Sequence, residues 1–164
     1  MTSLPTFVGN APYPPRRDDW RRLAATAQRL SDQRAAGYPQ AVADGKMTQA
    51  DADRGLRVMR AVAEQWRRVD AGEDLPEPAD YARALGASWA EMADDLTRAA
   101  TRAAEIAAKR SDDRAAAEQA QLVAALAWHE QPTDSQCAFP HIAIAHDYAQ
   151  WERRRAAGQG RHAA

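Results

Sequence analysis

Histidine and cysteine side chains near the C-terminal end of the chain are of the types that bind metals. His129, Cys137, His141 and His146 lie close together in the sequence, and thiolate and imidazole are ligands that zinc prefers. His141 and His146 would lie about 140° apart around a helix, so they do not share a face. Cys137 and His141 are therefore the residues that could converge on His129. Because the spacings fit no known zinc scheme, we prefer ordinary hydrogen-bonded or exposed histidines, and no cofactor is predicted.

The doublet His146-Asp147 is of a kind that occurs in the active sites of metal-dependent enzymes. Pairs of this kind ligate metals in phosphohydrolases, but such a site needs further His and Asp ligands, and only His129 is at hand. The sequence contains no nucleophile elbow, phosphate-binding glycine loop or HExxH helix, and it lacks the glutamate–histidine signatures of di-iron bundles. The motifs therefore favour a protein that is not an enzyme.

Arginine and aromatic residues are concentrated at the C-terminal end, where Tyr148 and Trp151 precede Arg153, Arg154 and Arg155. Arginine beside aromatic rings can stack on bases or pair with an acidic partner. Cations at a helix C-terminus also complement the helix dipole, and this simpler interpretation is preferred. If the protein binds a partner through this end, these five residues are the candidate contacts.

The N-terminal segment 1–16 is rich in proline, which excludes a helix and favours an extended or polyproline conformation. We expect an extended arm that drapes over the body or lacks fixed structure. Phe7 and Tyr13 give it a second interpretation, in which the arm docks on a partner through exposed aromatic rings.

The segment 81–96 has the pattern of a DNA-binding helix-turn-helix, with a small residue four positions before the turn glycine, Gly86. The supposed recognition helix would expose Glu91, Asp94 and Asp95 to phosphates, and those charges oppose binding. An ordinary capped junction between two helices is the preferred interpretation. A DNA-binding alternative would use Arg83, Ser88, Arg98 and Arg102.

A longer pattern covers residues 34–62. It consists of Arg34, Tyr38-Pro39-Gln-Ala-Val42, Gly45-Lys46-Met47-Thr48, Ala52-Asp53-Arg54 and Met59-Arg60-Ala61-Val62. This segment resembles the R…YPxLVxxGxxTxxxAxxxxxxMxAI pattern of small proteins of unknown function from phages, prophages and proteobacterial genomes. The resemblance implies a mobile-element origin and no activity. Physically, it predicts a helix–turn–helix-like clip in which Gly45 makes the turn, and Tyr38 and Val42 pack on Leu56 and Met59.

The elements that position these residues are predicted to be helices, because apolar residues recur at helical spacing between capping residues and Gly or Pro. The expected helical segments run from Asp18 or Asp19 to Gly37, from Tyr38-Pro39 to Gly45, from Thr48 to Gly72, from Tyr81 to Gly86, from Ser88 to Arg110, from Ser111 or Asp112 to Pro132, and from Pro140 to the basic tail that starts at Arg153. Thr48 with Asp51, and Ser88 with Glu91, have the spacing of capping boxes.

The expected core is thin, because large aliphatic residues are few. Tryptophan compensates with one large anchor on each of five predicted helices, at Trp20, Trp66, Trp89, Trp128 and Trp151. In the long helix that begins after Ser88, the spacing predicts burial of Met92, Leu96, Ala99, Ala103 and Ile106. The sequence thus predicts an all-α bundle of five or six helices. We expect an extended N-terminal arm over 1–16, the helical bundle over 17–157 and a flexible basic tail over 158–164.

The charge balance bounds the function. The chain has 22 basic and 23 acidic residues and a formal net charge of −1, which argues against a strongly basic nucleic-acid binder. Cys137 is the single cysteine, so no internal disulfide is predicted. Neither a signal peptide nor an apolar run of membrane-spanning length is visible, so a cytoplasmic location away from membranes is expected.

These observations favour a non-catalytic interaction or accessory protein of phage or mobile-element type. It would present a helical surface to a protein partner, and one such role would be inhibition of a host defence complex. A homodimer is left open. The alternative is a DNA-associated regulator that uses the segment 81–96, with nucleic acid as the partner.

Overall fold

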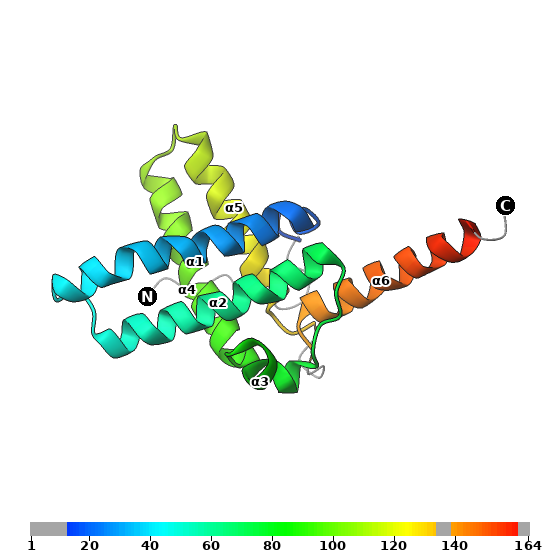
Figure 1. The fold of residues 1–164 in the computed structure, drawn as a ribbon. Helices are drawn as coiled ribbons and strands as arrows, with labels where there is room; N and C mark the ends of the chain where they lie inside the picture. Colours follow the sequence, from blue (N-terminus) through cyan, green and yellow to red (C-terminus); the bar gives the residue numbers. More distant parts are fainter. Residues whose placement is uncertain (1–12, 134–138, 161–164) are drawn as a thin grey trace.

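The computed structural model describes residues 13–133 and 139–160, and these fold almost entirely into helices (Figure 1). The elements are α1 (Trp20–Ala43), α2 (Gln49–Ala71), the short 3₁₀ helix η1 (Pro78–Asp80), α3 (Tyr81–Leu85), α4 (Trp89–Lys109), α5 (Arg114–His129) and α6 (His141–Gly160). No strand occurs in these residues, and a single bridge joins Pro132 to Pro140. The predicted all-α fold of five or six helices is confirmed, with six α-helices in the part of the chain that the structure describes.

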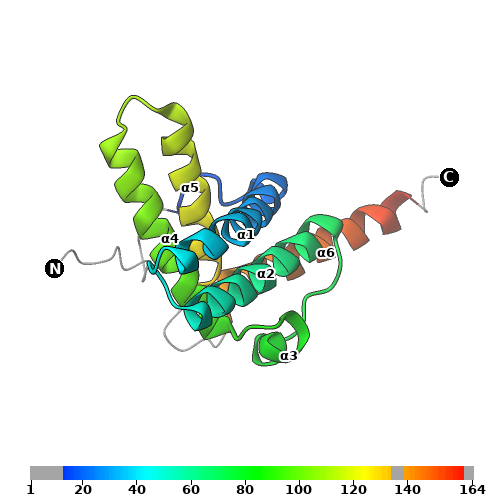
Figure 2. The same cartoon turned by 60° about the vertical axis from the view of Figure 1, so that its left-hand side comes forward.

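Two helical hairpins form the body of the molecule. Helices α1 and α2 lie side by side, and the hairpin of α4 and α5 stands across them, with its tip beyond their layer (Figure 1). Helix α3 lies at the base, and α6 runs away from the body toward the C-terminus in both views (Figure 2). Within the described part of the chain, no helix is long and apolar enough to cross a membrane.

The helix ends follow the predicted capping chemistry. The Thr48 hydroxyl accepts a hydrogen bond from the Asp51 amide at 3.1 Å. Ser88 and Glu91 form a complete capping box, in which each side chain accepts from the other residue's amide. Gly45 makes the turn between α1 and α2 with φ of +70°, a left-handed conformation that glycine adopts without steric cost.

Helix α1 does not end at Gly37, and the separate helical turn predicted after it does not form. The helix continues through Gly37, Tyr38 and Pro39 to Ala43. Pro39 removes one backbone hydrogen bond, but the Tyr38 ring packs against α2 at Gly55, where an added Cβ would lie 3.1 Å from ring atoms. The predicted contact of Tyr38 with α2 is therefore made one helical turn earlier than Met59.

Two further boundaries differ from the prediction, and one agrees with it. Asp113, not Ser111 or Asp112, caps α5, because its carboxylate accepts from the Ala116 amide at 3.0 Å. Asp19, one of the two predicted residues, is the N-cap of α1, although its side chain makes no capping hydrogen bond. Helix α6 continues to Gly160, through the residues after Arg153 where the sequence predicts a basic tail.

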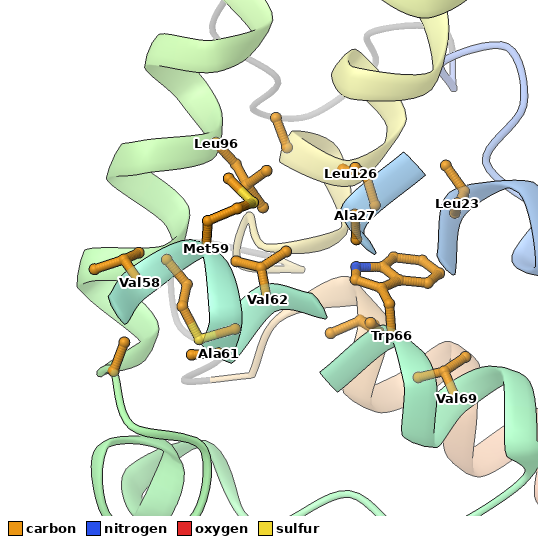
Figure 3. Packing of buried hydrophobic residues seen from close by; sticks show 14 of the residues in the cluster. Leu23, Ala27, Val58, Met59, Ala61, Val62, Trp66, Val69, Leu96 and Leu126 are labelled. Atoms are coloured by element: carbon orange, nitrogen blue, oxygen red, sulfur yellow. The ribbon is translucent and has the colours of Figure 1, made fainter. Parts of the chain in front are cut away.

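The buried core surrounds α2. Its cluster includes Leu23 and Ala27 from α1, Val58, Met59, Val62, Trp66 and Val69 from α2, Leu96 from α4 and Leu126 from α5 (Figure 3). Each large side chain that is fully buried stabilises the fold by about 1.5–3 kcal/mol. Two predicted core residues are wrong: Ile106 is 43% exposed, because the end of α4 extends past the α1–α2 layer, and Trp151 is 48% exposed on α6.

Candidate interaction surface on α6

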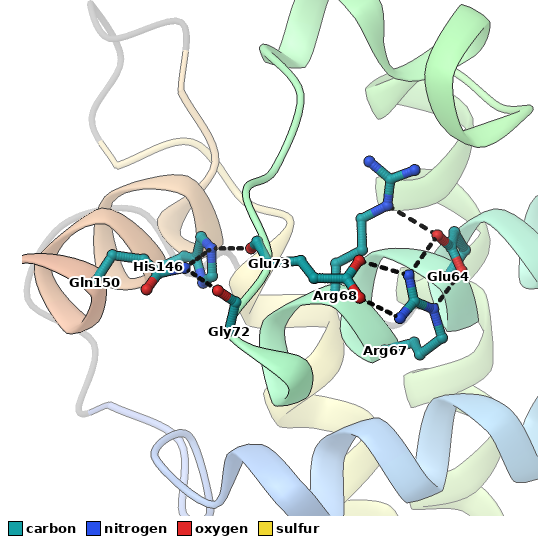
Figure 4. A network of polar contacts seen from close by, with 7 residues as sticks. All are labelled: Glu64, Arg67, Arg68, Gly72, Glu73, His146 and Gln150. Atoms are coloured by element: carbon teal, nitrogen blue, oxygen red, sulfur yellow. Dashed lines mark hydrogen bonds and ion pairs between the residues drawn. The ribbon is translucent and has the colours of Figure 1, made fainter. Parts of the chain in front are cut away.

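One face of α6 fixes the helix to the body. Ile142 is fully buried. His146, Gln150 and Arg153 lie on the same face and contact the turn that follows α2. The His146 Nε2–H donates to the Glu73 carbonyl at 2.7 Å, and the Gln150 amide donates to the Gly72 carbonyl at 2.5 Å (Figure 4). These bonds satisfy backbone carbonyls just beyond the end of α2 and set the direction in which α6 leaves the body.

The same turn is held from its other side by charged residues of α2. Arg67 binds the carboxylates of both Glu64 and Glu73, and Arg68 binds Glu64 at 2.8 Å (Figure 4). The hydrogen bonds from Arg67 and Arg68 lower the pKa of Glu64 to about 2. Glu73 thus links two parts of the structure. Its side chain belongs to the charged network on α2, and its backbone carbonyl binds α6.

The opposite face of α6 carries large apolar side chains that no element of the described residues covers. Ile144 is 49% exposed, Tyr148 59% and Trp151 48%. The Tyr148 and Trp151 rings lie 5.8 Å apart, and the Arg155 guanidinium lies 5.4 Å from the Trp151 ring centroid. This exposed row on a projecting helix includes the aromatic residues predicted as partner contacts.

The three predicted contact arginines lie in different environments. Arg153 belongs to the inner face, where its guanidinium covers Gly72. Arg155 lies over Trp151 on the exposed face. Arg154 is exposed at the side of that face. The structure therefore groups Arg155 with the aromatic row and separates Arg153 from it.

The N-terminal candidates lie elsewhere. Phe7 lies outside the described residues. Tyr13 is 65% exposed, yet its ring packs edge-on against Trp128 at 5.6 Å, and the Arg17 guanidinium lies 3.7 Å from its centroid. Trp128 in turn stacks on His141 at the start of α6, with centroids 4.0 Å apart. Tyr13 thus continues an aromatic stack that reaches the base of α6.

The histidines considered as metal ligands bind backbone carbonyl groups. The His129 Nε2–H donates to the Arg17 carbonyl at 2.7 Å, and His141 donates to the Trp128 carbonyl at 3.2 Å. Burial lowers the pKa of His129 to about 4, so the ring is neutral at pH 7. Cys137 lies outside the described residues. Among the residues that are described, no group of three His, Cys, Asp or Glu side chains could hold a metal ion.

The helix-turn-helix-like segment is a capped junction in which the polar groups already have partners. The Ser88 hydroxyl belongs to the capping box, Arg83 pairs with Asp80 at 3.1 Å, and Arg98 pairs with Asp94 at 2.5 Å. Arg102 lines a groove of about 1140 Å³ between the two hairpins, together with residues of α1, α2 and α5.

Asp95 is buried, whereas the helix-turn-helix pattern of this segment predicts that it is exposed. Its carboxylate is buried and binds both terminal nitrogens of Arg34, at 2.9 and 2.5 Å. Arg34 also donates to the Gly55 carbonyl at 2.9 Å. This buried pair ties α1 to α2 and α4, and it gives a structural role to the arginine that opens the 34–62 pattern.

Sequence reasoning also missed a buried polar cluster at the end of α5. Glu130, Gln65 and Tyr81 are each fully buried. Among the described residues, neither Glu130 carboxylate oxygen has a hydrogen-bond partner of ordinary geometry. Burial raises the pKa of Glu130 to about 8, with Gln65 opposing the rise, so the acid is mostly protonated at pH 7. No local signal marks this residue, because its burial depends on helices distant in the sequence.

Comparison with known protein families, with curated protein sequences and with solved structures finds no match for this chain. Its function is therefore inferred from the geometry described above.

Proposed function

We propose that this chain is a non-catalytic interaction protein that binds a protein partner through the exposed face of α6. The observation that carries the proposal is the row of Ile144, Tyr148 and Trp151, three large apolar side chains that are each about half exposed on one face of a projecting helix. Aromatic side chains of this kind dominate the binding energy of protein interfaces. Helices with such a row commonly dock in an apolar groove.

The surroundings of the row support a binding role. Ile142, His146 and Gln150 fix the inner face of α6 to the body. The exposed face therefore stays turned toward solvent and does not pack against the body. Arg155 flanks the aromatic rings, and arginine is enriched in interface hot spots. The mobile-element origin implied by the 34–62 pattern fits an accessory protein and stays a prediction.

A capture experiment with matched variants tests this proposal. The full chain serves as bait, beside a Tyr148→Ala/Trp151→Ala variant and an Ile106→Ala control, which removes an exposed apolar residue from α4. We expect a stoichiometric protein to bind the wild-type chain and the control, and to be lost from the double variant. Capture that is equal for all three baits, or recovery of nucleic acid alone, would overturn the proposal.

A further inference from the structure

The exposed row on α6 has the spacing of a coiled-coil seam. Ile144, Tyr148, Trp151 and Arg155 follow one another at intervals of four, three and four residues. At 3.6 residues per turn these positions fall within a narrow stripe. Alternation of three and four is the pattern by which one helix packs lengthwise against another. The fixed face of α6, with Ile142 and His146, lies on the other side of the helix. A second helix can therefore lie along the seam without contacting the anchoring residues.

The charges beside the seam select the kind of helix that fits. Asp147 and Arg154 flank the seam on one side, at equivalent positions of successive heptads, and Glu152 flanks it on the other side. Among the described residues no ion pair is recorded for Asp147 or Arg154, and both are exposed. These two opposite charges on one edge of the seam are available to a partner helix.

The same edge is complementary to itself when the second helix runs in the opposite direction. In an antiparallel pair with Tyr148 opposite Trp151, flanking positions of the same type face each other. Asp147 then faces Arg154 of the partner subunit, and the two-fold axis repeats that contact. The apolar stem of Arg155 lies opposite Ile144 of the partner subunit, with its charged end in solvent.

A parallel pair is disfavoured by the same residues. In that orientation the flanking position of Asp147 faces the position of Glu152 on the other helix, and the symmetry makes this repulsion twice. The choice between the two orientations therefore follows from the order of charges along α6.

We infer that the α6 seam pairs with the same seam of a second copy of this chain, in antiparallel orientation. This inference rests on the proposed function, because it names the partner of the same surface. A single pair of short helices buries less than the roughly 1,600 Å² of a standard interface. The dimer is accordingly one that dissociates on dilution, and it leaves the seam free for another protein at low concentration.

Sedimentation velocity over a concentration series, with a charge-swap cycle, tests the inference. The wild-type chain should shift from monomer to dimer as concentration rises. Asp147→Arg and Arg154→Asp should each weaken the dimer on the order of tenfold, because two attractive contacts become repulsive. The double variant Asp147→Arg/Arg154→Asp should recover most of the wild-type affinity. Glu105→Arg on α4 is the control for Asp147→Arg, since it makes the same change in net charge at an exposed site away from the seam.

Each alternative outcome overturns the inference in a recognisable way. A chain that stays monomeric at every concentration, or a dimer that survives Tyr148→Ala/Trp151→Ala, excludes pairing through the seam. A dimer strengthened by Asp147→Arg alone is parallel, because that change removes the repulsion from Glu152. Failure here is separate from failure of the proposed function, since a monomeric chain that captures a different protein through α6 still satisfies the latter. All the substituted residues are exposed, so circular dichroism should show unchanged helix content and Tm.

Discussion

Glu130 is a carboxylic acid enclosed in the core at the junction of α5 with α2, α3 and α4. Its backbone carbonyl accepts a hydrogen bond from the Trp89 indole at 2.7 Å, while its side chain faces Gln65 and the buried Tyr81. No basic group of the described residues offsets the burial that raises its pKa to about 8. An acid in this state costs stability wherever the unfolded chain ionises it and the folded chain does not.

Replacing Glu130 should change how stability depends on pH. The folded pKa of about 8 lies above the ordinary value of 4.5, so the folded state holds the proton longer. Stability is then full below pH 4.5 and falls as pH rises to 8, by a total on the order of 5 kcal/mol. Glu130→Gln keeps the shape and removes the titration. Urea unfolding at pH 5 and pH 8.5 should show a large loss for the wild-type chain and a much smaller one for the variant.

The control for that experiment is Glu105→Gln, which neutralises an exposed acid on α4. Its unfolding free energy should follow the wild-type pH dependence within about 0.5 kcal/mol. An unchanged slope in Glu130→Gln would show that the buried acid ionises in the folded state.

The continuity of α1 across Gly37 makes a prediction at the level of the helix. Gly37 is exposed, helical, and has no atom within 4 Å of an added Cβ. Gly37→Ala should therefore raise the free energy of unfolding by up to about 1 kcal/mol. Gly72→Ala, at a left-handed φ of +70° under Arg153, should lower it. Thermal unfolding followed by circular dichroism gives both values. Destabilisation by Gly37→Ala would instead support the helix end predicted from the sequence.

The Arg34–Asp95 pair joins three helices, and its loss should affect them together. Arg34→Ala leaves the Asp95 carboxylate buried and unpaired, which costs about 3–5 kcal/mol. Arg98→Ala is the matched control, because the Arg98–Asp94 pair lies on the same helix with both side chains more than two-thirds exposed, and its loss should cost less than about 1 kcal/mol. Equal denaturation midpoints for the two variants would contradict a central role for the buried pair.

Local rules predicted much of this architecture and failed where tertiary contacts decide. Thr48 and Ser88 were identified as caps because capping chemistry lies within a few residues. Gly37 and Pro39 locally indicate a helix end, but the packing of Tyr38 on α2 carries α1 past them. Tyr148 and Trp151 are candidate contacts in the sequence because aromatic residues stand there beside arginines. The partners of Glu130 and Asp95 are distant in the sequence, and periodicity carries no information about them.

For the whole molecule, two neighbouring buried groups set opposite limits on stability. His129 has its pKa lowered by burial to about 4 from 6.5, so its contribution is full above pH 6.5 and is lost as pH falls to 4. Glu130 acts in the other direction, between pH 4.5 and 8. The two slopes cancel between pH 4.5 and 6.5. Unfolding free energies measured from pH 3.5 to 9 should therefore show a plateau in that window and a decline on both sides. A maximum above pH 8 would contradict this pairing.

The separation of the tryptophans gives the protein an optical property of its own. Trp66 is fully buried beside the Trp20 and His129 rings, whereas Trp151 is about half exposed midway along α6. A water-soluble quencher such as iodide should quench the fluorescence of Trp151 and should not quench that of Trp66. The red edge of the emission spectrum therefore includes the signal of Trp151 on α6 together with the partly exposed Trp20, Trp89 and Trp128, and the blue edge reports on the core. Binding of any molecule to this face of α6 should shift the tryptophan emission to shorter wavelength and reduce quenching by iodide, so that no added dye is needed.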